Sequence, residues 1–342
     1  INQNYAAAYF HKARLLTNAD DFEDARKNYE TAIDIDDRFT DAHYYLAKLL
    51  SGGIATDKEG TLIDKKDLPE AKKLLLKVLL LEKKHAKACY NLGRIFSIEE
   101  NYKEAKKYLI LALKIDPKYP KAHFLLARAY ETFESHVEAK AHYGHAIESH
   151  PDFALAHFRL GVRLFEEGSA TEAEEHLRQS ISLESQNSEA HYYLAMILRT
   201  DDDPSLAKKH FFRALEINPE FALAYYELAH HSEKNGDLNE AKIHFQKATD
   251  IEQNFVEAYF HLARISTNPS EYDQAFRNYE TALEIDPQMA ECHYWFGKLL
   301  TTGEKLKNDG TLVWEPDPMR AEEHFRKAIK INPKYSNAYF KL

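Results

Sequence analysis

The chain has 342 residues, and 44% of them are hydrophobic, which is enough to build a long core. Its net charge is -10 at pH 7 with both signs interspersed, which argues against nucleic acid as the main partner because phosphates require a positive surface. No apolar run reaches the roughly 18 residues of a membrane span, and no secretion signal opens the sequence.

From the start of the chain, the dominant feature is an alanine that returns every 34 residues. Ala8 and Ala42 have this spacing, and it then continues through six further alanines. Two intervals are longer by 12 residues: Ala42 to Ala88, and Cys292 to Ala338. A fixed period of this length predicts a solenoid of identical helical or strand units. The six further alanines are Ala88, Ala122, Ala156, Ala190, Ala224 and Ala258.

Each period contains two helical patterns. In residues 122–157, apolar side chains recur at helical spacing around Leu126 and Tyr130, and again around Ala139 and Tyr143. A polar stretch separates these two patterns, and Pro151 ends the second because proline has no N–H to donate. The unit is therefore predicted to be helix, turn, helix, turn.

Small residues mark two further positions, when the recurring alanine is taken as position 3 of a repeat. Position 8 is always Ala or Gly, and position 20 is always Ala, which lets paired helices approach closely. Position 8 is Ala13, Ala47, Gly93, Ala127, Gly161, Ala195, Ala229, Ala263 and Gly297. Position 20 is Ala25, Ala71, Ala105, Ala139, Ala173, Ala207, Ala241, Ala275 and Ala321.

These residues, together with Leu at position 7 and Pro at position 32 in most repeats, resemble the tetratricopeptide repeat family. The resemblance implies an all-α α-solenoid, wound as a right-handed superhelix of about nine repeats plus a partial tenth. It also implies that the first helix of each pair lines a concave groove. We expect one solenoid over residues 1–342. Its repeats are expected at residues 6–39, 40–85, 86–119, 120–153, 154–187, 188–221, 222–255, 256–289, 290–335 and, in part, 336–342.

The beginning of the chain is repeated 250 residues later. INQNYAAAYFHKARLLTN at residues 1–18 corresponds to IEQNFVEAYFHLARISTN at residues 251–268. The two loops that contain the 12-residue insertions, residues 51–68 and 301–318, are also 250 residues apart, and each contains Gly-Thr-Leu. A duplicated block of seven repeats explains this, and two such loops one superhelical turn apart would lie on the same side. The alternative is a duplication without geometric meaning.

Two positions of the first helices are candidates for the groove surface. Position 5 is aromatic in every repeat, and position 9 is mostly Arg or Lys. The aromatic residues could form a binding ladder or pack against the next repeat, and the cations could bind an acidic partner or stack on the aromatic ring four residues earlier. The candidate protein-binding residues are Phe10, Arg14, Tyr44, Lys48, Tyr90, Arg94, Phe124, Arg128, Phe158, Tyr192, Tyr226, Phe260, Arg264, Tyr294 and Lys298.

Histidine also recurs at fixed positions. Position 23 is His142, His176, His210 and His244 in four consecutive repeats. Equivalent residues of adjacent repeats are a helix pair apart, so neighbours in this column cannot share a metal ion, and polar packing at repeat junctions is the expected role. Position 4 is histidine in five repeats: His43, His123, His157, His191 and His293.

We therefore expect no metal, no cofactor and no catalytic residue, because no nucleophile elbow, phosphate loop or dinucleotide fingerprint is present. The expected function is a protein-protein interaction scaffold that binds a peptide or helical segment of a partner in the groove, and an acidic partner would suit the basic residues at position 9. One alternative is head-to-tail self-assembly through uncapped ends. Another is the targeting arm of a larger enzyme, since the chain starts at Ile1 and stops inside a helix, as a fragment would.

The expected location is cytoplasmic. Cys89 and Cys292 are the only cysteines, and they lie six repeats apart, so they cannot form a disulfide within one chain. A reduced compartment agrees with so few cysteines.

Overall fold

The computed structural model describes residues 3–16, 18–52, 54–56, 62–64, 66–199, 204–302 and 316–342. Its contacts divide the chain into two compact units, residues 1–184 and residues 185–342, and each is described by itself. One continuous solenoid over the whole chain therefore stays a prediction.

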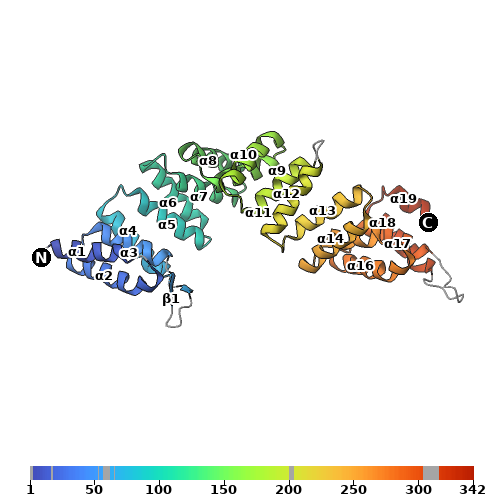
Figure 1. The fold of residues 1–342 in the computed structure, drawn as a ribbon, viewed down its shortest axis with the longest axis horizontal. Helices are drawn as coiled ribbons and strands as arrows, with labels where there is room; N and C mark the ends of the chain where they lie inside the picture. Colours follow the sequence, from blue (N-terminus) through green and yellow to red (C-terminus); the bar gives the residue numbers. More distant parts are fainter. Residues whose placement is uncertain are drawn as a thin grey trace. The chain divides into compact units, whose positions relative to one another are not determined.

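The first unit consists of consecutive antiparallel helix pairs (Figure 1). Its elements are α1 (Gln3–Leu15), η1 (Ala19–Asp21), α2 (Phe22–Ile35), α3 (Thr40–Gly52), β1 (Ile54–Thr56), β2 (Leu62–Asp64), α4 (Leu68–Leu81), α5 (Ala86–Ile98), α6 (Tyr102–Ile115), α7 (Pro120–Glu131), α8 (His136–Ser149), α9 (Ala154–Glu166) and α10 (Ala170–Leu183).

The second unit has the same organisation. Its elements are α11 (Ser188–Leu198), α12 (Pro204–Ile217), α13 (Ala222–Lys234), α14 (Leu238–Ile251), α15 (Val256–Ile265), η2 (Pro269–Glu271), α16 (Tyr272–Ile285), α17 (Ala290–Thr301), α18 (Pro318–Ile331) and α19 (Ser336–Lys341). Within the described residues, the chain thus forms nine helix pairs and the first helix of a tenth, which confirms the predicted α-solenoid.

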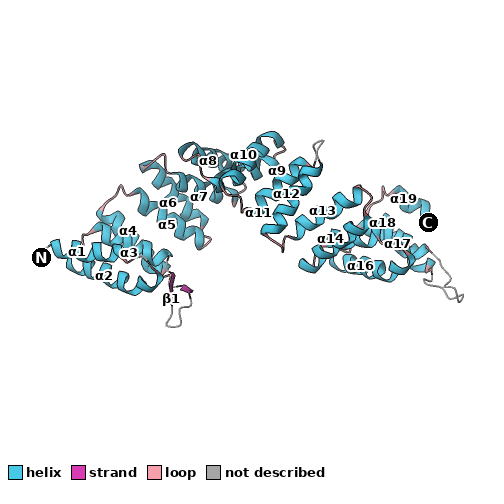
Figure 2. Cartoon of the chain, in the orientation of Figure 1, coloured by secondary structure: helices cyan, strands magenta, loops and turns pink. Residues whose placement is uncertain are grey.

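One local feature was not predicted. β1 and β2 form a short antiparallel hairpin inside the first insertion, with Ala55 opposite Ile63, and β1 contacts η1 (Figure 2). The insertion lies outside the 34-residue period, so the helical pattern gives no information about it. Both Gly-Thr-Leu motifs lie wholly or partly outside the described residues, as do residues 303–315 of the second insertion. No described helix has the length and apolar character needed to cross a membrane.

The small residues at position 8 have the geometric role that the sequence suggested. A Cβ atom on Gly93 would lie 2.6 Å from Cγ of Leu109 on the second helix of the same pair. The corresponding distance is 2.9 Å from Gly161 to Cγ of Leu177. Helix pairs are therefore in close contact at this position, and their second helices contribute large, fully buried side chains there.

The turns between repeats form with or without proline. Asp116, before Pro117, accepts a hydrogen bond from the N–H of Lys118 at 3.2 Å. Asp36, which has no proline after it, accepts the equivalent bond from the N–H of Arg38 at 3.0 Å. An Asp side chain that bonds two residues ahead stabilises a turn by itself, so proline is dispensable at this place.

Candidate functional site

The position-5 aromatic rings lie at the junctions between repeats. The ring of Phe124 is 5.1 Å from that of Phe153, just before the next first helix, and Tyr226 is 4.8 Å from Phe255 in the same way. Such contacts use one face of each ring inside the solenoid. Six candidate rings are buried: Phe10, Tyr44, Phe124, Phe158, Tyr192 and Phe260.

Three candidate rings are only partly buried: Tyr90, Tyr226 and Tyr294. Packing therefore accounts for the six buried aromatic residues, and these three keep surface that a ligand could contact. A ligand-binding role stays a prediction for all nine.

The position-9 cations differ in their surroundings. Arg14 lies over the ring of Phe10 at 5.8 Å, as the stacking alternative predicts. Arg94 instead donates a hydrogen bond to Oγ of Ser51 at 2.7 Å. Lys48 and Arg128 are exposed. Stacking within the helix therefore explains some of these cations and leaves others available.

An aromatic residue at position 6, which the sequence analysis did not select, lies between two of these cations in each unit. In the first unit, Tyr45 has Arg14 at 5.2 Å and Lys48 at 5.9 Å from its ring centroid. In the second, Trp295 has Arg264 at 5.9 Å and Lys298 at 4.3 Å. We call these the Tyr45 triad and the Trp295 triad.

The two triads correspond across the 250-residue duplication, residue by residue. Arg14, Tyr45 and Lys48 become Arg264, Trp295 and Lys298. Each triad joins two consecutive first helices, because its arginine comes from one repeat and its aromatic residue from the next. The duplication was the available signal for this arrangement, since it pairs the three residues of one triad with those of the other.

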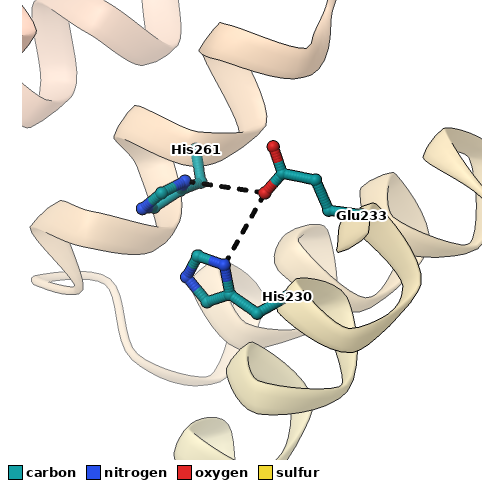
Figure 3. A group of neighbouring side chains, drawn as sticks. All are labelled: His230, Glu233 and His261. Atoms are coloured by element: carbon teal, nitrogen blue, oxygen red, sulfur yellow. Dashed lines mark ion pairs between the residues drawn. The ribbon is translucent and has the colours of Figure 1, made fainter. Parts of the chain in front are cut away.

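In the second unit, the arginine of the triad also joins a cluster of titratable side chains. Arg264 Nη2 donates to Oε1 of Glu233 at 2.5 Å and lies 3.0 Å from Nδ1 of His261. Nδ1 of His230 lies 3.6 Å from Oε2 of Glu233, and Nδ1 of His261 lies 3.8 Å from it. Figure 3 shows the two imidazole rings and the carboxylate pointing toward one another.

Helix geometry and aromatic packing hold this cluster in place. His230 and Glu233 are three residues apart on α13, so they share one face of it, and His261 comes from α15. The ring of Phe245 stacks on His261 at 5.5 Å and meets His230 edge-on at 5.3 Å.

The surroundings favour neutral imidazoles. Burial, followed by the nearby Arg264, lowers the pKa of His230 to about 4. Burial, followed by His230, lowers the pKa of His261 to about 3. Burial also raises the pKa of Glu233, against the opposing effect of Arg264. Both rings therefore carry an unprotonated nitrogen at neutral pH.

Beside this cluster lies a hollow of about 980 Å³. Tyr226, His230 and Glu233 line it, together with an ion pair between Arg199 and the buried Glu227. This hollow beside α13 thus has both charged and aromatic side chains, which suits a polar ligand.

Histidines at positions 4 and 23 pair within four helix pairs. Nδ1 of His123 lies 2.9 Å from Nδ1 of His142, so the two rings link α7 to α8. Nε2 of His123 lies 3.0 Å from the carbonyl oxygen of Pro117, which can only accept a hydrogen bond. His123 is therefore assigned as the acceptor at Nδ1, and His142 as the donor. The other pairs are His157–His176, His191–His210 and His293–His324, with Nδ1 atoms 3.0, 2.9 and 2.8 Å apart.

These pairs explain eight histidines as polar packing, but the packing lies within one repeat and not at the repeat junctions where it was expected. His43 and His244 have no such partner, because Leu74 and Tyr225 stand at the opposite positions. Burial, followed by the partner His123, lowers the pKa of His142 to about 4. Burial, followed by the partner His293, lowers the pKa of His324 to about 4 as well. Each pair is stable as two neutral rings, since a proton on the accepting nitrogen would place two N–H groups face to face.

Comparison with known proteins supports the same architecture. Among solved structures, Pseudomonas aeruginosa pilF is 21% identical with a TM-score of 0.56, over 62% of this chain and 97% of that chain. The APC/C hetero-tetramer Cut9–Hcn1 is 17% identical with a TM-score of 0.55, over 87% of this chain and 58% of that chain. A repeat protein from Cytophaga hutchinsonii is 13% identical with a TM-score of 0.54, over 74% of this chain and 99% of that chain. At these identities the likeness shows the fold alone.

No curated protein sequence matches the chain. Tetratricopeptide repeat models match residues 6–39, 86–119, 222–255 and 256–289, and a second such model matches residues 124–190. These matches cover more than half of the sequence, and the helix pairs with small residues at their contacts agree with them. The chain belongs to the tetratricopeptide repeat family.

Proposed function

We propose that the chain is a protein-interaction scaffold that binds an acidic peptide or helical segment of a partner on the face of its first helices. The two triads carry this proposal. Each combines two cations with an aromatic ring on consecutive first helices, and carboxylates form charge-assisted hydrogen bonds with such cations. Within each unit, a bound segment gains affinity from several modest contacts with the triad and its neighbours.

Aromatic and Arg side chains are the usual anchors of protein interfaces, and Tyr45 and Trp295 are partly exposed for this role. We assign the chain no catalytic role and no cofactor. We place it in the cytoplasm, in agreement with its two free, buried cysteines. The structure of Cut9–Hcn1 describes an assembly, and a scaffold role would give this chain a comparable use of the fold.

There are two alternative functions. The chain could assemble head to tail with other copies, or it could be the targeting arm of a larger enzyme. Self-assembly predicts a mass in light scattering that rises with concentration, whereas the scaffold proposal predicts a constant mass without partner. An enzyme arm would use the same face for substrate recognition, so the binding experiment below applies to it as well.

We expect that a random peptide library selected on the immobilised chain enriches acidic peptides. In fluorescence anisotropy, the double variant Lys48→Glu/Lys298→Glu should bind the best peptide roughly tenfold more weakly, because it reverses one cation in each triad. Added salt should weaken binding to the unchanged chain. Lys107→Glu, which reverses an exposed cation on the second helix α6, is the matched control and should bind normally. Enrichment of neutral or basic peptides, or equal losses in both variants, would contradict the proposal.

A further inference from the structure

The cluster of His230, Glu233 and His261 has the spacing of a metal-binding site. One ligand atom from each residue can be chosen such that all three lie within 4.8 Å of one another. Zinc bonds to histidine nitrogen and carboxylate oxygen are about 2.0–2.2 Å long, so tetrahedral donor atoms are about 3.4 Å apart. The distances of 3.6 and 3.8 Å between the Nδ1 atoms and Oε2 of Glu233 require only small side-chain movements to reach this spacing.

The chemistry of the three groups also fits. Two neutral imidazoles and one carboxylate are a ligand set that proteins use for Zn²⁺, with a fourth position left for water or another ligand. His230 and Glu233 line the 980 Å³ hollow, so a fourth ligand can approach from that side. Phe245 packs against both rings and restricts their motion, and pre-oriented ligands lose less entropy on binding.

Arg264 is the competitor for this site. Its guanidinium donates to Glu233 and to His261, so a cation already balances the carboxylate. The Nε of Arg264 is buried and has no hydrogen-bond partner among the described residues. The same side chain lies over Trp295, so it can keep one favourable contact when it releases His261. A Zn²⁺ ion would then balance the Glu233 carboxylate with two positive charges, where the Arg264 guanidinium supplies one.

We propose that His230, Glu233 and His261 form a Zn²⁺ site that joins α13 to α15, in competition with Arg264. Zinc bound there links two adjacent repeats, and Arg264 keeps its contact with Trp295. The site shares Arg264 with the Trp295 triad, so zinc binding is tested without any peptide, and failure of this proposal can be told from failure of the proposed peptide binding.

The test is calorimetric titration of the metal-free chain with ZnCl₂. We expect binding of one zinc ion per chain, and Co²⁺ should show the visible absorption of a four-coordinate centre.

The variants test the individual ligands. Glu233→Gln and His261→Ala should each lower zinc affinity by about tenfold or more, since each removes a ligand. Arg264→Ala should raise it by a similar factor, because the competing cation is gone. Thermal unfolding should shift upward with zinc in the unchanged chain and much less in Glu233→Gln, which keeps the side-chain shape.

Two controls separate this site from the other histidines. His231→Ala removes a neighbour that also lines the hollow, and His142→Asn removes a paired histidine of the first unit. Both should bind zinc as the unchanged chain does. The absence of a saturable equivalent, unchanged affinity in His261→Ala, or weaker binding in Arg264→Ala would each overturn the proposal.

Discussion

Gly93→Val should lower the free energy of unfolding by about 2–3 kcal/mol, while Gly144→Val should raise it by a few tenths of a kcal/mol. Both glycines lie in helices, α5 and α8, so the change in helix propensity is the same and slightly favourable. The two sites differ only in what the new side chain meets.

At Gly93, the added Cβ would lie 2.6 Å from Cγ of Leu109 and 3.2 Å from the carbonyl oxygen of Ala105. Leu109 is 0% exposed, so it cannot move into solvent. Valine is branched at this atom and would force the two helices apart. At Gly144, nothing lies within 4 Å of the added atom.

Urea denaturation followed by circular dichroism measures both variants. We expect the same substitution to change the free energy of unfolding in opposite directions at the two glycines. Equal changes in the free energy of unfolding of the two variants would mean that close contact between paired helices does not govern position 8.

The paired histidines should make the fold sensitive to mild acid. His142 and His324 have folded-state pKa values of about 4, below the ordinary value of 6.5 that applies in the unfolded chain. Their contribution to stability is therefore complete above pH 6.5 and is lost as the pH falls from 6.5 toward about 4. The loss is at most roughly 1 kcal/mol per pH unit for each histidine after solvent screening is included.

Other charged groups face the first of these pairs. His145 contacts both rings, Lys106 opposes protonation of His142, and Tyr130 stacks on His142. The carboxylates that favour protonation are Glu138 near His142, and Asp116 and Glu148 near His123. Burial outweighs these carboxylates, so the pKa of both rings is lowered.

The double variant His123→Tyr/His142→Asn tests this sensitivity. It places Tyr at position 4 and Asn at position 23, as another repeat of the chain already has at Tyr259 and Asn278, so the helix pair should still form. Its stability should fall less than that of the unchanged chain between about pH 7 and about pH 5. His150→Asn changes an exposed histidine and should leave the pH dependence as it was.

Carboxylates contribute equally to the pH dependence of the two chains, since the double variant changes none of them. Burial raises the pKa of Glu227 and of Glu233. The pKa of Glu240 and that of Glu323 are lowered by hydrogen bonds and nearby cations, so their contributions are lost below their ordinary value of 4.5. An unchanged slope in the double variant above pH 5 would show that the histidine pairs are not responsible.

The repeat architecture could be predicted from the sequence because its signals are local. Alanine at positions 3 and 20 and a small residue at position 8 mark the contacts of the helix pair, and residues such as Pro117 mark its end. The hairpin in the first insertion could not, since it lies outside the period and its strands are three residues long.

The contacts of the candidate site were harder to predict. Glu233 and Arg264 are in different repeats, and nothing in the spacing of one repeat indicates which side chains meet across the junction. The histidine pairs were easier to predict, because His123 and His142 belong to one repeat and the same combination recurs in others. Finding them required knowing that positions 4 and 23 face each other across the pair.

Partners bind the first helices of the repeats in the proposed function. Hydrogen exchange followed by mass spectrometry tests this directly, with and without the acidic peptide selected on the chain. We expect slower exchange in α3, α15 and α17, which carry most residues of the two triads, and little change in α4, α16 and α18. Protection confined to those second helices would contradict the account.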